Sequence, residues 1–91
     1  MAMIAVFLNI DEERMVAALQ EAARSLESGQ GEAVLDFSSV HRIDSSGLRA
    51  MEDFARIADE KAVKVVLRGV KIDVYKVLKL VKLTRRFLFV N

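Results

Sequence analysis

Residues 35–48 read LDFSSVHRIDSSGL, a run that opens on the end of an apolar segment and closes on the start of an amphipathic one. Asp44 and Ser45 are both residue types that cap the first turn of a helix, and Gly47 relaxes the backbone there. The run therefore predicts a buried strand that ends at Phe37, a short loop, and a helix that begins at Asp44 or Ser45.

Outward from this run, apolar and amphipathic segments alternate along the chain. The expected strands are residues 3–9, 33–37, 64–67 and 87–90. The expected helices run from the N-cap Asp11 to Gly29 and Gly31, from Asp44 or Ser45 onward, and from Val70 to about Val81. In the last of these helices, the residues expected to face inward are Val74, Val77, Leu78 and Val81. Such alternation predicts an α/β fold, with a mostly parallel four-stranded sheet and helices packed against it.

The composition allows one domain, residues 1–91, and little metal or thiol chemistry. A chain of 91 residues buries a single modest core, and 53% hydrophobic residues leave a surplus for a contact patch, so we expect a partner, a homodimer or both. The chain has no cysteine and one histidine, so we expect no metal site and no cofactor. The net charge of +1 provides no general attraction to nucleic acid.

The distribution of apolar residues argues against a membrane location. No apolar run reaches the about 18 residues of a membrane-spanning helix. Residues 1–10 are apolar but lack the basic start of a signal peptide. We therefore expect a cytoplasmic protein that does not insert into a membrane.

Catalysis and nucleic-acid binding are both disfavoured. Ser45 with His41 could suggest a nucleophile and its base, but His41 lies in the loop four residues earlier and no third, orienting residue is evident. A Gly-x-Ser-x-Gly turn is also absent, so we expect no enzymatic activity. Positive charge gathers near the C-terminus at Lys71, Lys76, Lys79, Lys82, Arg85 and Arg86. Without interleaved aromatic residues, this cluster indicates a solvated face or an acidic protein partner.

The sequence resembles a known family. Residues 35–38 and 43–48 resemble the signature of STAS domains, the family of the bacterial anti-sigma factor antagonists. Residues 65–70, 74–80 and 87–89 look like that family's later strand, helix and final strand. The resemblance runs from Ala33 to the end of the chain and implies a single STAS domain.

The resemblance implies a switch between partners. An unphosphorylated antagonist of this kind binds an anti-sigma factor that is also a serine kinase, and phosphorylation by that kinase breaks the complex. Ser45 matches the phosphorylated serine, and Ser46 is a second candidate. A phosphoserine would add about −1.5 to −2 charges beside Asp44. The residues implied to contact the partner are Asp36, Asp44, Ser45, Ser46, Gly47, Leu48 and Met51.

Two features leave alternatives open. Family members usually begin with a pair of strands, whereas one clear strand fits before Asp11, and an exposed sheet edge would favour a homodimer. Residues 67–76 also resemble another STAS branch, the small subunit of a bacterial phospholipid-transport ABC complex. That branch often carries threonine and glycine where this chain has Ser45 and Ser46. The presence of both serines here therefore favours the phosphorylation switch. A transporter subunit and a scaffold in a larger signalling complex remain the alternatives.

Overall fold

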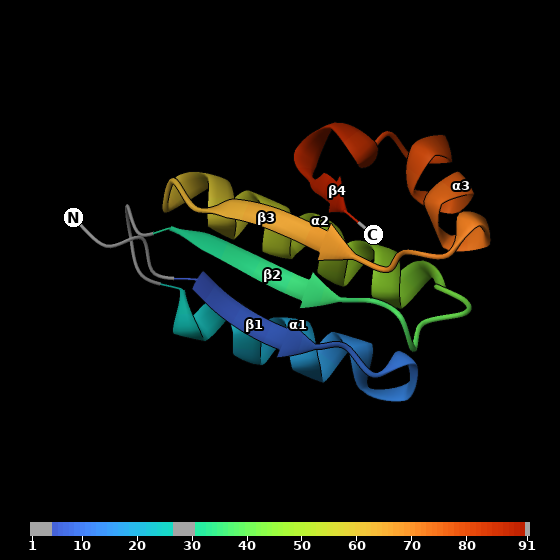
Figure 1. The fold of residues 1–91 in the computed structure, drawn as a ribbon, viewed down its shortest axis with the longest axis horizontal. Helices are drawn as coiled ribbons and strands as arrows, with labels where there is room; N and C mark the ends of the chain where they lie inside the picture. Colours follow the sequence, from blue (N-terminus) through green and yellow to red (C-terminus); the bar gives the residue numbers. More distant parts are fainter. Residues whose placement is uncertain (1–4, 27–30, 91) are drawn as a thin grey trace.

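In the computed structural model, which describes residues 5–26 and 31–90, strands and helices alternate along the chain (Figure 1). The strands are β1 (Ala5–Asn9), β2 (Glu32–Asp36), β3 (Lys64–Arg68) and β4 (Leu88–Val90). The α-helices are α1 (Met15–Ser25), α2 (Ser45–Glu60) and α3 (Ile72–Leu80). Two 3₁₀ turns, η1 (Glu12–Arg14) and η2 (Thr84–Arg86), precede α1 and β4. The element order is the one that the sequence predicts.

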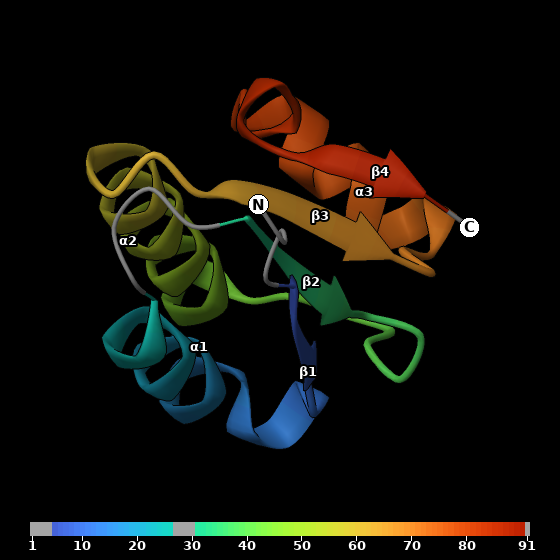
Figure 2. The ribbon, with the colours of Figure 1, turned by 60° about the vertical axis from the view of Figure 1, so that its left-hand side comes forward.

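The strands form one parallel sheet in the order β1-β2-β3-β4. Helices α1 and α2 lie together on one face of this sheet, behind it in Figure 1 and to one side of it in Figure 2. Each connection advances by one strand, as right-handed crossovers on a single face require. The predicted α/β fold with a parallel four-stranded sheet is therefore confirmed.

The core occupies the space between the sheet and its helices. Leu35 and Leu67 are fully buried, and they pair in register with the half-buried Leu8 and Phe89 to form one apolar row across all four strands. Phe54 of α2 belongs to the same core. Alternate residues of the strands point to the opposite face, away from α1 and α2 (Figure 2).

Several predicted boundaries differ from the structure. The first helix begins as the turn η1 behind the N-cap Asp11, whose side chain accepts a hydrogen bond from the Glu13 N–H. The helix ends at Ser25, and the predicted stop at Gly29 falls outside the described residues, as does the start of the first strand at Met3. The strand predicted to end at Phe37 ends one residue earlier, because the Phe37 carbonyl already accepts a turn hydrogen bond from the Val40 N–H at 2.9 Å.

The third helix is shorter than predicted. It begins at Ile72 and ends at Leu80, where the next turn places Lys82 at φ 64°. Val74 and Leu78 are buried as expected, but Val81 is 46% exposed because it lies beyond the end of the helix. The expectation that Val81 faces inward is therefore wrong.

The turn after α2 offers a test of backbone strain. Ala62 adopts φ 57°, and the Val63 N–H closes the helix by donating to the Ala58 carbonyl at 2.9 Å. A non-glycine residue in this left-handed conformation is strained, so Ala62→Gly should raise the free energy of unfolding by about 1 kcal/mol. Ala17→Gly on the exposed side of α1 should lower it by about 1 kcal/mol. Urea denaturation checks both values, and a loss of stability in Ala62→Gly would contradict the strain.

Candidate functional site

The first turn of α2 carries the serine pair. Asp44 is the N-cap, and its Oδ1 accepts hydrogen bonds from the Gly47 N–H and the Ser46 hydroxyl, both at 2.8 Å. Ser45 is the first residue of the helix and is exposed. Within residues 5–26 and 31–90, its side chain makes no hydrogen bond, whereas the hydroxyl of Ser46 donates to Asp44.

Gly47 is buried beneath this turn, for a reason that the sequence does not reveal. A Cβ atom there would lie 3.0 Å from Ile43 Cγ1 and 3.0 Å from Met15 Sδ. The backbone of Gly47 is helical, so the residue serves close packing and not the loosened turn that the sequence suggested. The serine turn therefore rests directly on α1 and on the loop before it.

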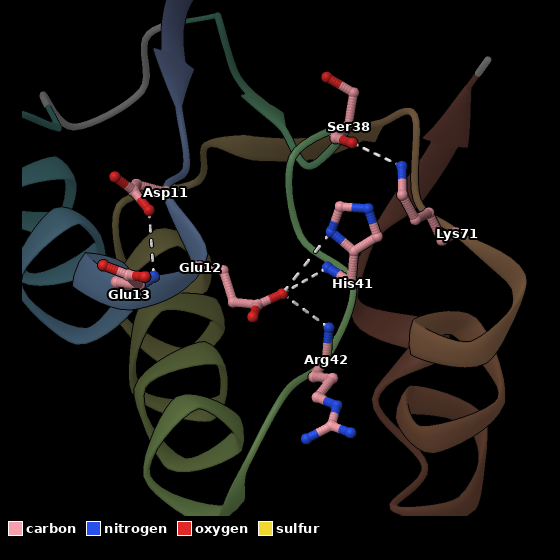
Figure 3. A network of polar contacts seen from close by, with 7 residues as sticks. All are labelled: Asp11, Glu12, Glu13, Ser38, His41, Arg42 and Lys71. Atoms are coloured by element: carbon pink, nitrogen blue, oxygen red, sulfur yellow. Dashed lines mark hydrogen bonds and ion pairs between the residues drawn. The ribbon is translucent and has the colours of Figure 1, made fainter.

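The loop between β2 and α2 begins with a tight polar turn. Asp36 Oδ1 accepts from the Ser38 N–H at 2.8 Å and from the Ser38 hydroxyl at 2.6 Å. Lys71 Nζ donates to the Ser38 carbonyl at 2.6 Å, from the segment that precedes α3 (Figure 3). Gly69 adopts φ 69°, and a Cβ on it would lie 3.1 Å from Ser38 Cβ. The start of the loop is thus held by Asp36 at the end of β2 and by Gly69 and Lys71 in the segment before α3.

Glu12 holds the middle of the same loop. Its Oε1 accepts from the His41 N–H at 2.6 Å and from the Arg42 N–H at 2.9 Å, and His41 Nδ1 lies 3.9 Å away (Figure 3). Neither Glu12 nor Lys71 could be identified as a loop anchor from the sequence. The acidic first turn after Asp11 signals helix capping only, and these hydrogen bonds join residues 29 to 33 positions apart. Local sequence patterns do not predict contacts between residues so far apart in the chain.

These hydrogen bonds stabilise three carboxylates in their charged form. The backbone N–H of His41, followed by that of Arg42, lowers the pKa of Glu12 below 4.5. The Ser38 hydroxyl, followed by its N–H, lowers the pKa of Asp36 below 3.8. The Gly47 N–H, followed by the Ser46 hydroxyl, lowers the pKa of Asp44 in the same way. All three carboxylates therefore carry negative charge at neutral pH, and that of Asp44 lies directly at the serine turn.

These lowered pKa values predict a loss of stability in acid. A carboxylate whose pKa is lower in the folded state stabilises the protein above its unfolded pKa, and that contribution disappears as the pH falls through the folded value. Glu12→Gln should therefore be less stable than the wild type at neutral pH, and the gap should close as the pH falls below 4.5. Urea denaturation at several pH values measures the gap, with Glu52→Gln on α2 as the charge control. A gap that stays constant with pH would contradict the role of the Glu12 charge.

The structure exposes only some of the expected contact residues, and it buries Gly47 and Met51. Asp44, Ser45 and Ser46 are exposed at the start of α2, and Asp36 is half-buried at the end of β2. Leu48 is half-buried and packs against the core. The side chain of Met51 is 0% exposed because it lies on the inner face of α2, so it packs in the core and cannot contact a partner directly.

Within residues 5–26 and 31–90, no group of three or more histidine or acidic side chains lies close enough together to hold a metal ion. No helix in these ranges is both long and apolar enough to cross a membrane. His41, which the sequence raised as a possible base, is exposed and lies against Glu12 (Figure 3).

Comparisons with known proteins agree on the fold. The model of the STAS domain family matches residues 5–91. A sulfate transporter family protein from Wolinella succinogenes superposes with a TM-score of 0.78 at 17% identity, covering 98% of this chain and 80% of that one. A putative anti-sigma factor antagonist from Thermotoga maritima has a TM-score of 0.75 at 17% identity, covering 99% and 83%.

A third solved structure is the Bacillus cell fate determinant SpoIIAA in its phosphorylated form. It superposes with a TM-score of 0.58 at 19% identity, covering 98% of this chain and 81% of that one. No curated protein sequence matches the chain. At these identities the structural likeness shows the fold alone, and the serine turn has to be judged on its own geometry.

Proposed function

The chain belongs to the STAS domain family, and from that premise we propose that it is a non-catalytic module that binds an anti-sigma factor with serine kinase activity. Phosphorylation of Ser45 ends the binding. The kinase transfers the γ-phosphoryl group of ATP, so that an O–P bond forms at Ser45 Oγ, ADP leaves and the hydroxyl proton is released. Ser46 is the second candidate for the same modification.

One observation carries the proposal: Ser45 is exposed in the first turn of a 16-residue helix, and its hydroxyl makes no hydrogen bond to any described residue. A kinase can reach a hydroxyl in this position without unfolding the domain. Ser46, by contrast, donates its hydroxyl to Asp44, so its modification would have to break that hydrogen bond. The geometry therefore supports Ser45 before Ser46.

The surroundings of Ser45 suit an electrostatic switch. A phosphate on Ser45 would lie near the unpaired N–H groups of the first turn, which favour negative charge, so the domain itself should stay folded. The same phosphate would add about −1.5 to −2 charges next to Asp44. A partner that packs on this turn would then meet repulsion and a desolvation cost. Modification thus acts on the complex and spares the fold.

The exposed start of α2 and the loop before it form the proposed docking face. Ser45, Ser46 and Asp44 lie at its centre, with Leu48 at its edge. Gly47 shapes the turn from beneath, whereas Asp36 shares the strand face of Val34, opposite α2, and so lies outside this docking face. Glu12 and Lys71 hold the loop in place and so act as positioning residues.

The proposal is tested by isolating the tagged chain from cells that produce it and identifying both its partners and the Ser45 peptide by mass spectrometry. A serine kinase of the anti-sigma type, with phosphate on Ser45, is the expected result. Ser45→Ala should keep the kinase bound and lose the phosphate, whereas phosphate that persists in this variant would move the site to Ser46. Transporter subunits with an unmodified Ser45 would overturn the proposal in favour of the lipid-transport branch.

A further inference from the structure

The face of the sheet opposite α1 and α2 carries an apolar row. Phe7, Val34, Val66 and Leu88 pair in register across all four strands. Phe7 is 71% exposed and Leu88 is 52% exposed, although both are large apolar residues. Val66, at the centre of the row, is little exposed but lies outside the core cluster that its neighbours Val65 and Leu67 join. This row forms the centre of what we call the open face, which is turned toward the viewer in Figure 1.

Charged residues flank the row on both sides with a regular alternation of sign. Two positions before the row lie Glu32 on β2 and Lys64 on β3, which are partners in the strand register. Two positions after it lie Asp36 and Arg68, which also pair. Because side chains of a strand alternate between faces, all four belong to the open face. On each side of the apolar row, β2 thus carries the negative charge and β3 the positive one.

This pattern is complementary to itself under one two-fold rotation. Consider two copies stacked face to face, with the two-fold axis between their sheets. When this axis is parallel to the strands and lies over the gap between β2 and β3, β2 of one copy faces β3 of the other. Glu32 then meets Lys64, and Asp36 meets Arg68. The apolar rows then face each other as well. When the axis runs across the strands instead, Glu32 meets Asp36 and Lys64 meets Arg68, which brings like charges together. The charges therefore select the first arrangement.

We propose that the open face is an interface between two copies of this chain, stacked sheet on sheet with the strands of both copies running in the same direction. Two sheets that pack in this aligned way lie about 10 Å apart, close enough for the facing apolar rows to interdigitate. A four-stranded face with strands of three to five residues is small, so the dimer is a weak one. It leaves α2 and the serine turn free, because they lie on the other side of the sheet (Figure 2).

The test uses sedimentation velocity of the full chain at concentrations up to about 1 mM, the range in which weak interfaces are populated. The wild type should shift from 10.2 kDa toward twice that mass. Glu32→Lys and Lys64→Glu each bring like charges together and should raise the dissociation constant at least tenfold.

An equimolar mixture of these two variants should form a heterodimer again. The lysine introduced in one variant then faces the glutamate introduced in the other, while the unchanged Lys64 of the first faces the unchanged Glu32 of the second. Both contacts thus join opposite charges, as in the wild-type dimer. A general loss of stability or solubility in the single variants would not be repaired by mixing them.

Each outcome is decisive for the proposal. A wild type that stays monomeric at every concentration overturns it, as do single variants that dimerise normally or a mixture that does not recover. Phe7→Arg should also abolish the dimer, while Leu80→Glu on the distant, exposed end of α3 should not. Circular dichroism of each variant confirms that it is folded. Lys64→Glu should still bind the Ser45-dependent partner, so failure of this proposal is separate from failure of the proposed function.

Discussion

Ser45→Asp is expected to weaken binding of the partner at least tenfold while the domain stays folded. The new carboxylate lies at the first residue of α2, where the N–H groups of the helix favour a negative charge, so stability should not fall. On the docking face the same charge stands next to Asp44, whose lowered pKa keeps it ionised. Like charges brought together at an interface cost several kcal/mol, and about 1.4 kcal/mol already corresponds to a tenfold loss of affinity.

A neutral variant of the same shape separates charge from size. Ser45→Asn introduces a side chain of nearly the same volume as aspartate but without its charge, so it should bind within a few-fold of the wild type. Titration calorimetry with the isolated partner compares the two variants, and thermal denaturation confirms that both are folded. Equal losses for aspartate and asparagine would show that Ser45 acts through its size, which would contradict the electrostatic switch.

The position of the serine turn could be predicted because its signals are local. Asp44 as N-cap and Ser45 as first helical residue follow from residue types within a single turn, and the structure places α2 at Ser45–Glu60 accordingly. The parallel direction of the strands could also be predicted, because strands that alternate with helices along the chain are usually parallel. The long-range hydrogen bonds that hold the loop before this turn could not be predicted. Glu12 reaches His41 over 29 positions, and the sequence between them contains no trace of that contact.

Whether an apolar residue faces the core or the surface is also difficult to predict from the sequence. Met51 falls on one face of α2 by its spacing, but spacing alone does not say whether that face meets a partner or the sheet. Phe7 and Leu8 stand side by side in a short apolar run, and only the pairing of Leu8 with Leu35 decides which of them enters the core. In a strand of five residues, an apolar run without polar alternation leaves both faces possible.

Phe37→Ala should lower the free energy of unfolding by about 3–5 kcal/mol, because removal of this large side chain, which is 0% exposed, would leave a cavity. Phe37 stands where β2 turns into the loop, and its N–H donates to the Arg68 carbonyl at 2.8 Å. Small domains are stable by about 5–15 kcal/mol, so the variant should be close to unfolding. Phe37→Leu, which keeps most of the volume, should fold with a loss of only about 1 kcal/mol.

Phe7→Ala is the matched control for this loss. It removes the same side chain from the open face, where Phe7 is 71% exposed, so in dilute solution the free energy of unfolding should change by less than about 0.5 kcal/mol. Urea denaturation at low protein concentration, where a weak dimer is absent, compares the two alanine variants. Similar losses would mean that both faces of the sheet are covered in the monomer, and the open face would then have no room for a second copy. A large difference would fix which face is buried by the chain itself, independently of any measurement of dimerisation.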